Sequence, residues 1–463
     1  MPELSPWLNM KTKNLHLLTL LIFVGILLLG SYMRNESIYG TTVIFPIRAD
    51  AREHLTYAYN LRYKGTYSKD NSAILHPDRS VKPDAYRNPG YPLFISMFVE
   101  DKPSNKNVLD ITFAQMILSS ITLVIAFYVF QGFLSKSWAL AAAFLTAISP
   151  HLITANSYIL TETLFCFILV LTAAIARLFA EKPSIFRAAG IGICLAGGFL
   201  VRPSLLYFPI VILVFFCIHF GRKRGFFYFF GLLAGFVVVV SPWFIRNLVT
   251  LKTISDPSLK IAFLHHGLYP DFTYNDDENT FGYPYQHDPR SEEIMRNTGT
   301  VLNEIVSRFQ NRPVEHILWF VFKKPIALWS WNMVQGYQEV FIYEVSSTPY
   351  QDNKLFRLTH RLARLLHWPI VGLAFMGLWI TWFTGRLYGD SVPKMLLARY
   401  VSVLLIYFTL LHMAGAPFPR YTVPLRPLLY AMAMFTLSYG IDLIRNRFGP
   451  APEKSSAQEK VSR

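Results

Sequence analysis

The stretch that decides the fold is residues 204–246, SLLYFPIVILVFFCIHFGRKRGFFYFFGLLAGFVVVVSPWFIR. It holds two apolar runs, 204–220 and 225–246, on either side of a basic Arg-Lys-Arg cluster at 222–224. Each run approaches the roughly 20 residues that a membrane helix needs. A basic cluster in so short a loop is typical of the cytoplasmic side of a membrane. The stretch therefore predicts two membrane helices joined by a cytoplasmic turn.

The rest of the chain continues this pattern. Of its 463 residues, 52% are hydrophobic and 16% are charged, against roughly 25% charged residues in soluble proteins. The segment 313–331 is short and charged, and is predicted to be an interfacial helix. The predicted fold class is an all-α polytopic membrane protein of about 10 transmembrane helices, and about 12 at most. The apolar runs that serve as candidate spans are 14–33, 109–132, 138–156, 160–180, 186–202, 204–220, 225–246, 368–385, 396–415 and 422–444.

Basic residues in the short loops set the orientation, because cytoplasmic loops are enriched in Lys and Arg. Placing the cluster at 222–224 in the cytoplasm puts both termini there and leaves two long insertions outside, each expected to carry interfacial helices. The predicted organisation is a cytoplasmic N-terminus at 1–13, an N-terminal transmembrane module at 14–246 with an outer loop at 34–108, a large outer loop at 247–367, C-terminal transmembrane helices at 368–444 and a cytoplasmic tail at 445–463.

Charge and cysteine content narrow the function. The formal charge of +15, from 44 Lys and Arg against 29 Asp and Glu, can indicate a nucleic-acid partner. No nucleic-acid-binding module accompanies this charge, and cytoplasmic loops account for basic residues, so no nucleic-acid partner is predicted. Cys166, Cys194 and Cys217 lie within apolar runs, where cysteine is usually a small buried residue, which excludes a disulfide-stapled domain.

Ionisable residues near membrane depth are costly and usually have a partner or a function. In this chain they gather at the outer ends of the predicted spans, on one side of the membrane and next to both outer segments. A charged site at the outer rim is therefore expected. Its candidate members are His151, Glu162, Arg202, Arg246, Arg420 and Arg426.

The first outer segment contains the motif RADAREHLTYAYNL at residues 48–61. Asp50 and Glu53 match a capping box, in which Asp50 precedes a helix and Glu53 is its third residue. The apolar residues that follow recur at helical spacing. Asp50 therefore either caps an interfacial helix or is a carboxylate held at the membrane surface for chemistry. The two roles are compatible, because a capping carboxylate is rigidly placed.

A second motif in the same segment is YRNPGYP at residues 86–92. Its prolines and glycine fix a turn and present Arg87 in a defined direction. The turn is either an ordinary one with a solvated arginine or an anion clamp, because Arg matches phosphate geometry well.

The second outer segment is rich in aromatic residues between 263 and 287, interleaved with His265, His266 and His287. These side chains either contact a sugar or acceptor, or pack within the loop. No cofactor is predicted, and a divalent metal is left open, because the spacing matches no metal-binding template. The chain has no Walker motif, no dinucleotide-binding glycine pattern and no Ser-His-Asp order.

These motifs resemble the GT-C superfamily of membrane glycosyltransferases, and in particular bacterial relatives of the dolichyl-phosphate-mannose–protein mannosyltransferases and the aminoarabinose transferases. The resemblance begins with Asp50, the stretch 58–65 and the turn at 87–92, and covers about residues 14–435. It continues in order through Leu160-Thr-Glu162-Thr-Leu, Val201-Arg-Pro203-Ser, Pro242-Trp-Phe-Ile-Arg246-Asn247 and Arg420-Tyr421-Thr-Val-Pro424-Leu.

The resemblance implies an enzyme that moves a sugar from a polyprenyl-phosphate donor to a hydroxyl acceptor on the outer face of the membrane. Asp50 aligns with the catalytic aspartate of the family. Two positions depart from the family pattern. Many members have an acidic residue directly after this aspartate, where this chain has Ala51, and many have an aromatic residue where this chain has His54. The first departure puts in doubt a metal site that needs an acidic pair.

These residues fit a single displacement that inverts the anomeric carbon, with Asp50 as the general base. The groups expected to bind the departing phosphate are Arg87, Arg202, Arg246 and Arg420. The residues expected to position the substrate are Glu162, His54, Tyr57 and Tyr421.

The expected partners are a polyprenyl-phosphate sugar donor, a lipid, glycan or protein acceptor, and membrane lipids. The expected location is a bacterial inner membrane, with the active site on the periplasmic face. Three alternatives stay open. A lipid-linked glycan transporter or flippase would have charges at the bilayer midplane. An O-antigen ligase or polymerase would not need the Asp50 helix after the first span. A non-catalytic scaffold would accept lysine in place of the outer arginines.

Overall fold

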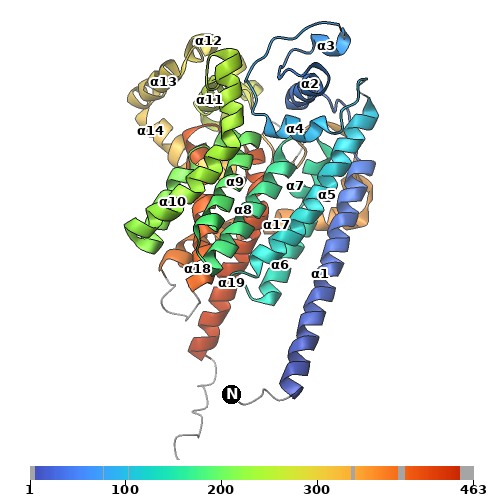
Figure 1. The fold of residues 1–463 in the computed structure, drawn as a ribbon, viewed down its shortest axis with the longest axis vertical. Helices are drawn as coiled ribbons and strands as arrows, with labels where there is room; N and C mark the ends of the chain where they lie inside the picture. Colours follow the sequence, from blue (N-terminus) through green and yellow to red (C-terminus); the bar gives the residue numbers. More distant parts are fainter. Residues whose placement is uncertain (1–5, 77, 103, 335–338, 384–391, 449–463) are drawn as a thin grey trace, which may run out of the picture.

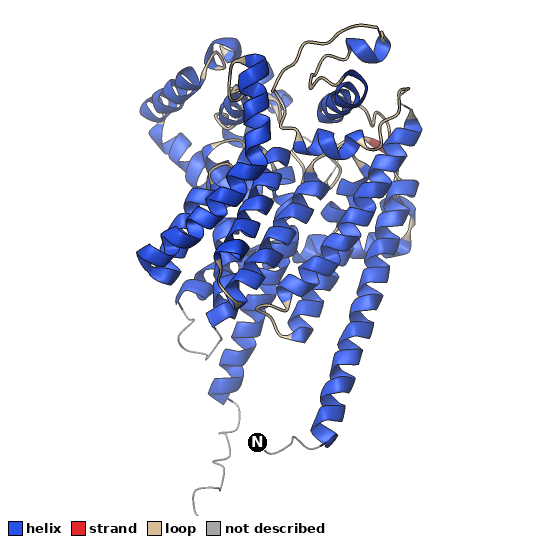
Figure 2. Ribbon diagram, in the orientation of Figure 1, coloured by secondary structure: helices blue, strands red, loops and turns tan. Residues whose placement is uncertain are grey.

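Almost all of the described chain is helical (Figures 1 and 2). The computed structural model describes residues 6–76, 78–102, 104–334, 339–383 and 392–448. Seven helices in this part are long and apolar enough to cross a membrane, and an eighth span results if the bent pair α6 and α7 is counted as one. The chain is therefore a multi-pass integral membrane protein. The seven are α1 (Pro6–Gly40), α5 (Asn105–Phe130), α8 (Glu162–Glu181), α10 (Phe208–Leu251), α17 (Lys354–Phe383), α18 (Val392–Ala414) and α19 (Arg426–Phe448).

The prediction of about 10 spans is not confirmed, and the difference has identifiable sources. Helix α9 (Ile185–Val201), predicted as the span 186–202, is apolar but has only 17 residues. The predicted spans 204–220 and 225–246 form a single element, α10, with a break at Gly221. The predicted span 138–156 is divided between α6 (Lys136–Ile148) and α7 (Pro150–Thr154), and the two parts meet at 49°.

The break in α10 is a reversal of the chain. Gly221 has φ 74° and ψ 162°, a conformation that glycine adopts without steric cost. A Cβ on Gly225 would lie 2.8 Å from the Cα of Cys217, so the two segments of α10 touch. The rings of Phe220 and Tyr228 meet across this contact at 5.1 Å. The stretch 204–246 thus forms two helical segments that pack against each other on either side of Gly221, although α10 counts as one of the seven helices above.

Three predicted boundaries also shift. Helix α1 continues past residue 33 to Gly40, and this buries Arg34, whose Nε donates to Ser119 Oγ at 2.8 Å. Helix α17 begins at Lys354 rather than at 368, and the last predicted span, from 422, begins as helix at Arg426. The carbonyl oxygens of Ala147 and Thr146 also accept from Arg34, so hydrogen bonds to a neighbouring helix accommodate this charge within the helix, and it did not mark the helix end.

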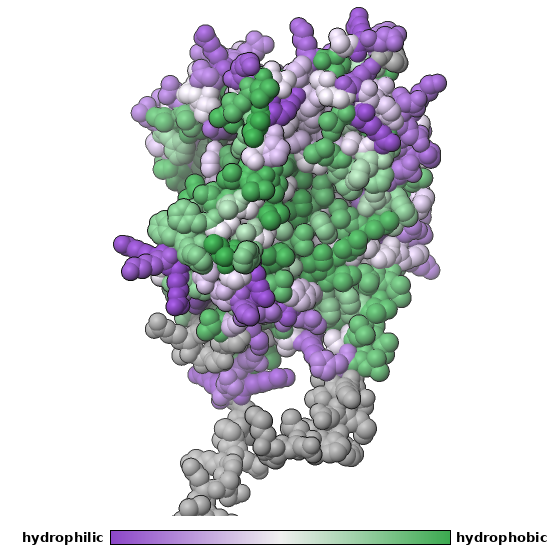
Figure 3. Space-filling model, in the orientation of Figure 1, coloured by the Kyte–Doolittle hydropathy of each residue, from purple (hydrophilic) through white to green (hydrophobic). Residues whose placement is uncertain are grey.

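The outer segments gather at one end of the helical bundle, opposite the N-terminus and the end of α19 (Figure 1). A broad apolar band crosses the middle of the face seen in Figure 3, with polar surface at both ends. The helices of the first segment are α2 (Ala49–Lys64), α3 (Ser72–Leu75) and α4 (Gly90–Ser96). Those of the second are α11 (Ser258–His266), α12 (Ser291–Ile294), α13 (Thr298–Asn311), α14 (Pro313–Ile317), α15 (Lys324–Leu328) and α16 (Pro349–Asp352).

The two outer segments are joined by a small antiparallel sheet. Strand β1 (Thr42–Val43) pairs with β2 (Val345–Ser347), with Thr42 opposite Ser347. Nearby, the 3-10 turn η7 (Pro419–Leu425) leads into α19. Residues 313–331 form α14, a π-helical turn and α15, and are not among the membrane-crossing helices. This stretch has an exposed apolar face, which is typical of a helix lying at a membrane surface.

Candidate active site

Asp50 lies in the first turn of α2, but it does not cap the helix. The helix begins at Ala49, its N-cap residue is Arg48, and the N-cap makes no side-chain hydrogen bond. The capping box predicted for Asp50 and Glu53 is therefore wrong, because arginine side chains occupy both carboxylates. Ala49 has φ 43°, a left-handed conformation that is uncommon outside glycine. Such strain is concentrated at functional sites, where the surrounding structure enforces it.

Two arginines from distant parts of the chain hold Asp50. Arg87 Nη2 donates to Asp50 Oδ1 at 2.7 Å, and Arg420 Nη2 donates to Oδ2 at 2.7 Å. Arg87 also donates through Nε to Glu53 Oε2 at 2.7 Å. Because each oxygen accepts from a different guanidinium, the Asp50 carboxylate is fixed in direction. Its side chain is still 25% exposed and can be reached by a substrate.

Arg420 extends this arrangement to a second carboxylate. Its Nε donates to Glu162 Oε1 at 3.2 Å, and Arg202 Nη2 lies 2.6 Å from the same oxygen. The Glu162 side chain is fully buried, and its Oε2 has no hydrogen-bond partner among the described residues. Three carboxylates and three guanidiniums are thus joined without net charge. We call them the rim network: Asp50, Glu53, Glu162, Arg87, Arg202 and Arg420.

The turn that carries Arg87 is anchored on the end of α9. Asn88 Nδ2 donates to the carbonyl oxygen of Phe199 at 2.6 Å. A Cβ at position 90 would lie 2.7 Å from the carbonyl carbon of Leu200, so only glycine fits against this backbone. The Asn-Pro-Gly sequence therefore docks the turn onto the membrane helices and directs Arg87 towards α2.

The charges of the rim network determine the protonation states of two side chains on α2, Asp50 and His54. Burial would raise the pKa of Asp50, but the guanidiniums of Arg420 and Arg87 outweigh it and hold the pKa well below its usual value. Burial, assisted by Arg87, lowers the pKa of His54 to about 3. At neutral pH, Asp50 is therefore a carboxylate and His54 is a neutral imidazole. The His54 ring meets Tyr91 edge-on at 4.9 Å.

Two tyrosines stand beside the rim network. The Tyr421 ring lies 5.8 Å from the guanidinium carbon of Arg202 and 5.9 Å from that of Arg420. Tyr343 donates through its hydroxyl to the Arg48 carbonyl at 3.3 Å, and burial followed by the nearby Asp50 charge raises its pKa. Tyr421 was expected here. Tyr343 was not, because it lies in a stretch of the second outer segment that carries no motif.

Two other predicted residues lie away from the rim network. Arg246 donates through Nη1 to the Asp84 carbonyl at 2.7 Å and through Nη2 to the Tyr67 carbonyl at 3.1 Å. Tyr57 donates to the Asp84 carboxylate and stacks on Tyr67 with ring centroids 4.3 Å apart. These contacts hold the loop between α2 and α4, so the structure gives both residues a supporting position.

We expect Arg246→Gln to loosen that loop, because hydrogen bonds from a charged donor contribute about 1.5–3 kcal/mol. Hydrogen exchange at backbone amides near Tyr67 and Asp84 should become several-fold faster, while the amides of α13 serve as an internal reference. Arg246→Lys keeps the charge and should show a smaller change. Unchanged exchange in the glutamine variant would assign Arg246 another role.

Part of the second outer segment reaches the same site. His266 stacks on Tyr285 with ring centroids 3.8 Å apart and planes 11° apart. His266 also lies 6.2 Å from Phe418, whose ring is 5.8 Å from Tyr421. Burial is the main cause that raises the pKa of Tyr285 to about 12, and the charge of Asp50 contributes to it. Tyr285 is therefore linked to Tyr421 through the rings of His266 and Phe418.

Other residues of this loop form its own core. Tyr269 donates to Asp288 Oδ2 at 2.8 Å, and its hydroxyl lies 2.8 Å from His265 Nε2. Arg308 Nη2 completes the cluster at 3.4 Å from Asp288. Within the part of the chain that the structure describes, no three His, Cys, Asp or Glu side chains are grouped so as to hold a metal ion. His265 therefore belongs to the core of the loop, and His266 belongs to the stack with Tyr285.

Comparisons with known proteins point to one class. Residues 87–245 match the family described as dolichyl-phosphate-mannose-protein mannosyltransferase. No curated protein sequence matches the chain at a significant level. The chain is similar in structure to the oligosaccharyltransferase of Archaeoglobus fulgidus, solved with a tethered acceptor peptide, with a TM-score of 0.52 and 15% identity. The match covers 94% of this chain and 52% of the archaeal protein, so the chain spans about half of that protein's length.

A further similar structure is ArnT from Cupriavidus metallidurans, solved with bound undecaprenyl phosphate. It is 13% identical, with a TM-score of 0.38, and the match covers 94% of this chain and 81% of ArnT. The resemblance seen in the sequence is confirmed by the family match and by the fold shared with the archaeal enzyme. Residues 87–245 thus match the dolichyl-phosphate-mannose-protein mannosyltransferase family, and the chain as a whole is similar in fold to the archaeal oligosaccharyltransferase.

Proposed function

We propose that this glycosyltransferase moves a sugar from a polyprenyl-phosphate donor to a hydroxyl acceptor, with Asp50 as the general base. The observation that supports this most is the bridging of Asp50 by Arg87 and Arg420. A carboxylate able to act as the base and two guanidiniums able to bind a phosphate thus lie within hydrogen-bond distance of one another. Helix α2, which carries Asp50, lies at the outer end of the molecule (Figure 1), and that end has polar surface in Figure 3.

The donor chemistry fits arginines better than an acid. When the bond between the anomeric carbon and the phosphate oxygen breaks, the electron pair stays on the phosphate, which is already a good leaving group. Guanidiniums aimed at those oxygens stabilise the developing charge. The side chains of Arg87, Arg202 and Arg420 keep 19%, 12% and 16% of their surface exposed, so each can offer an N–H group to a phosphate.

Because the rim network has no net charge, binding of the donor phosphate should rearrange its ion pairs. An incoming phosphate brings negative charge and competes with Asp50 and Glu162 for Arg420. As Arg420 turns towards the phosphate, Asp50 loses one of the charges that hold down its pKa. Asp50 is therefore a stronger base when the donor is bound than when the site is empty.

The acceptor step follows from the same geometry. The hydroxyl oxygen attacks the anomeric carbon from the face opposite the phosphate, and its proton passes to Asp50. One displacement with one base inverts the anomeric configuration. Glu162 holds Arg202 and Arg420 in place, and Tyr421, with His54, borders the space in which the sugar would sit.

The stacked pair His266 and Tyr285 is proposed to border the sugar site as well. We expect Tyr285→Ala to raise the KM for the acceptor or sugar by about tenfold, since a lost aromatic contact is worth about 1–3 kcal/mol with a sugar or a base face. The kcat should change less, because Tyr285 holds no proton in the reaction. Tyr285→Phe keeps the ring and should retain the wild-type KM. A tyrosine-to-alanine variant with unchanged KM would show that the stack only packs the loop.

The proposed setting is a bacterial inner membrane, with both termini in the cytoplasm and the rim network on the periplasmic face. The basic cluster at 222–224 supports this orientation. In this orientation the acceptor, a lipid, glycan or protein, would be reached from outside.

The decisive test uses the full chain in liposomes, with defined polyprenyl-phosphate sugars as donors. Mass spectrometry of envelope glycolipids and glycoproteins from cells with and without the gene would identify the sugar and the acceptor class together. Transfer from a lipid-linked donor, dependent on Asp50, supports the proposal. Movement of the intact donor across the membrane without transfer would support a transporter instead.

A further inference from the structure

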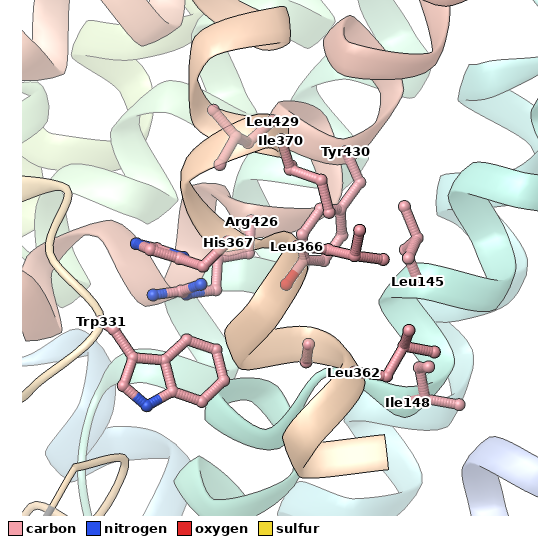
Figure 4. Close-up of a pocket in the computed structure, with 11 residues that line it drawn as sticks. Leu145, Ile148, Trp331, Leu362, Leu366, His367, Ile370, Arg426, Leu429 and Tyr430 are labelled. Carbon is pink, nitrogen blue, oxygen red and sulfur yellow. The ribbon is translucent and has the colours of Figure 1, made fainter. Parts of the chain in front are cut away.

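A pocket that contains a buried arginine lies apart from the rim network (Figure 4). It is formed by α6, α17 and α19, with Trp331 at one side, and encloses about 390 Å³ of empty space, open solvent included. Its walls are apolar, and the polar side chains of Arg426, Trp331, His367 and Tyr430 lie at one part of it. The walls are made by Leu145, Ile148, Leu362, Leu366, Ile370 and Leu429.

Arg426 is the unusual member of this pocket. It is 2% exposed, and its Nε has no hydrogen-bond partner among the described residues. No carboxylate in the described ranges forms an ion pair with it, whereas Arg87, Arg202 and Arg420 all have one. A buried cation without a counter-charge is expensive, so such a group usually has a ligand or a partner.

The surrounding polar groups leave this charge uncompensated. Trp331 is 8% exposed, and its Nε1 also has no hydrogen-bond partner in the described chain. His151 Nε2 lies 2.8 Å from the Trp331 carbonyl, and His367 Nε2 lies 2.7 Å from the Trp329 carbonyl. Each imidazole is therefore committed as a donor to a carbonyl and carries no negative charge. The pocket offers two unused donors, one cationic, and no anion.

The pocket also faces the lipid. On α17, the neighbours of the wall residues include Leu365, which is 75% exposed, and Trp368, which is 49% exposed. Large apolar residues exposed on a membrane helix contact acyl chains. Arg426 is the first residue of α19, at the level where a span meets the headgroups. A cation at headgroup depth above a leucine-lined groove is complementary to an amphipathic anion.

We propose that this pocket binds one anionic membrane phospholipid, with its phosphate at Arg426 and Trp331 and an acyl chain along α6 and α17. It is not the donor site, because the reacting sugar must lie beside the base, and the pocket is lined by no carboxylate among the described residues. The lipid supplies the missing counter-charge at the start of α19, directly after the turn η7 that carries Arg420. It thereby steadies the helix junction that supports the rim network.

The test is native mass spectrometry of the full chain in detergent with added phosphatidylglycerol or phosphatidylcholine of the same acyl chains. Wild type should retain phosphatidylglycerol preferentially. Arg426→Gln should weaken its binding by about tenfold or more, since it removes a charged hydrogen bond. Arg296→Gln makes the same charge change at an exposed loop position and should bind as wild type does.

Two further variants keep the test decisive if Arg426→Gln does not fold. Trp331→Phe keeps an aromatic side chain but replaces the indole with a smaller ring that has no N–H, and should weaken phosphatidylglycerol binding by about two- to tenfold. Leu366→Trp fills the groove without changing charge, and should reduce its retention as well. Equal retention of both lipids by wild type, or unchanged binding in the variants, overturns the proposal. Stronger competition by undecaprenyl phosphate, lost in Arg426→Gln, would assign the pocket to the carrier lipid and also overturn it.

Discussion

Asp50→Asn should lower the turnover rate by about 10²–10⁴-fold, because a general base typically contributes that much. The amide keeps the shape of the side chain, yet cannot take the proton of the acceptor. It also no longer competes with the donor phosphate for Arg87 and Arg420. Donor binding should therefore be retained or become tighter while transfer is lost, which a merely structural role for Asp50 would not produce.

Turnover in liposomes with a verified lipid-linked donor and a separate donor-binding assay measure the two effects. Glu53→Gln is the matched control, since Glu53 lies on the same helix and pairs with Arg87 but not with Arg420. Its turnover should fall far less. Near-normal transfer by Asp50→Asn would remove Asp50 from the base role.

Asp50 should not titrate within the pH range in which activity is usually measured. The pKa of Asp50 lies below its usual value, so this carboxylate stays ionised as the pH falls from 7 to 5. For a carboxylate with a lowered folded pKa, the stabilisation is present above the unfolded pKa of about 3.9 and is lost as the pH falls through the lower folded value. A loss of activity or of folding between pH 7 and 5 should therefore persist in Asp50→Asn.

Arg420→Gln should combine a loss of donor binding with a loss of stability. Arg420 is the link between Asp50 and the fully buried Glu162, and its removal leaves Glu162 with Arg202 alone. Breaking a buried ion pair costs about 3–5 kcal/mol, and the remaining arginine should keep the effect near the lower value. The loss of one preorganised donor to a developing anion lowers the rate by about 10²–10³-fold.

Thermal unfolding in detergent, together with KM for the donor, separates these effects. Arg420→Lys keeps the charge but replaces the rigid planar guanidinium with a compact ammonium, so it should recover stability more than activity. Retained donor affinity in a folded Arg420→Gln protein would contradict the phosphate-binding role.

Local sequence identified individual residues of the site, such as Asp50 and Arg87, better than it identified the residues with which they pair. Asp50 and Arg87 could be identified because a helix start and a proline-glycine turn are each recognisable from a few consecutive residues. The capping box was a wrong prediction for the same reason. Neighbouring residues suggested a hydrogen-bond partner close in sequence for Asp50. Arg420, which donates to Asp50 Oδ2, lies 370 positions away.

Position along a span was likewise an incomplete guide. Arg246 and Arg420 both lie near the outer ends of predicted spans, yet one holds a loop through backbone carbonyls and the other holds Asp50. Tyr343 and Tyr285 reach the site from the large outer loop, where no spacing rule applies. The direction in which a side chain points depends on how its helix is rotated against its neighbours, and only packing fixes that rotation.

By itself, the sequence determined that this is a multi-pass helical membrane protein with a basic cluster at 222–224 and charged residues at the ends of its apolar runs. Apolar length and charge are properties of a continuous stretch, so they can be read one segment at a time. The tertiary structure decided which arginine meets which carboxylate, that α10 reverses at Gly221, and that Arg426 faces a lipid-side groove. Those outcomes depend on close packing between segments far apart in the chain, and packing is satisfied only when all of them are in place.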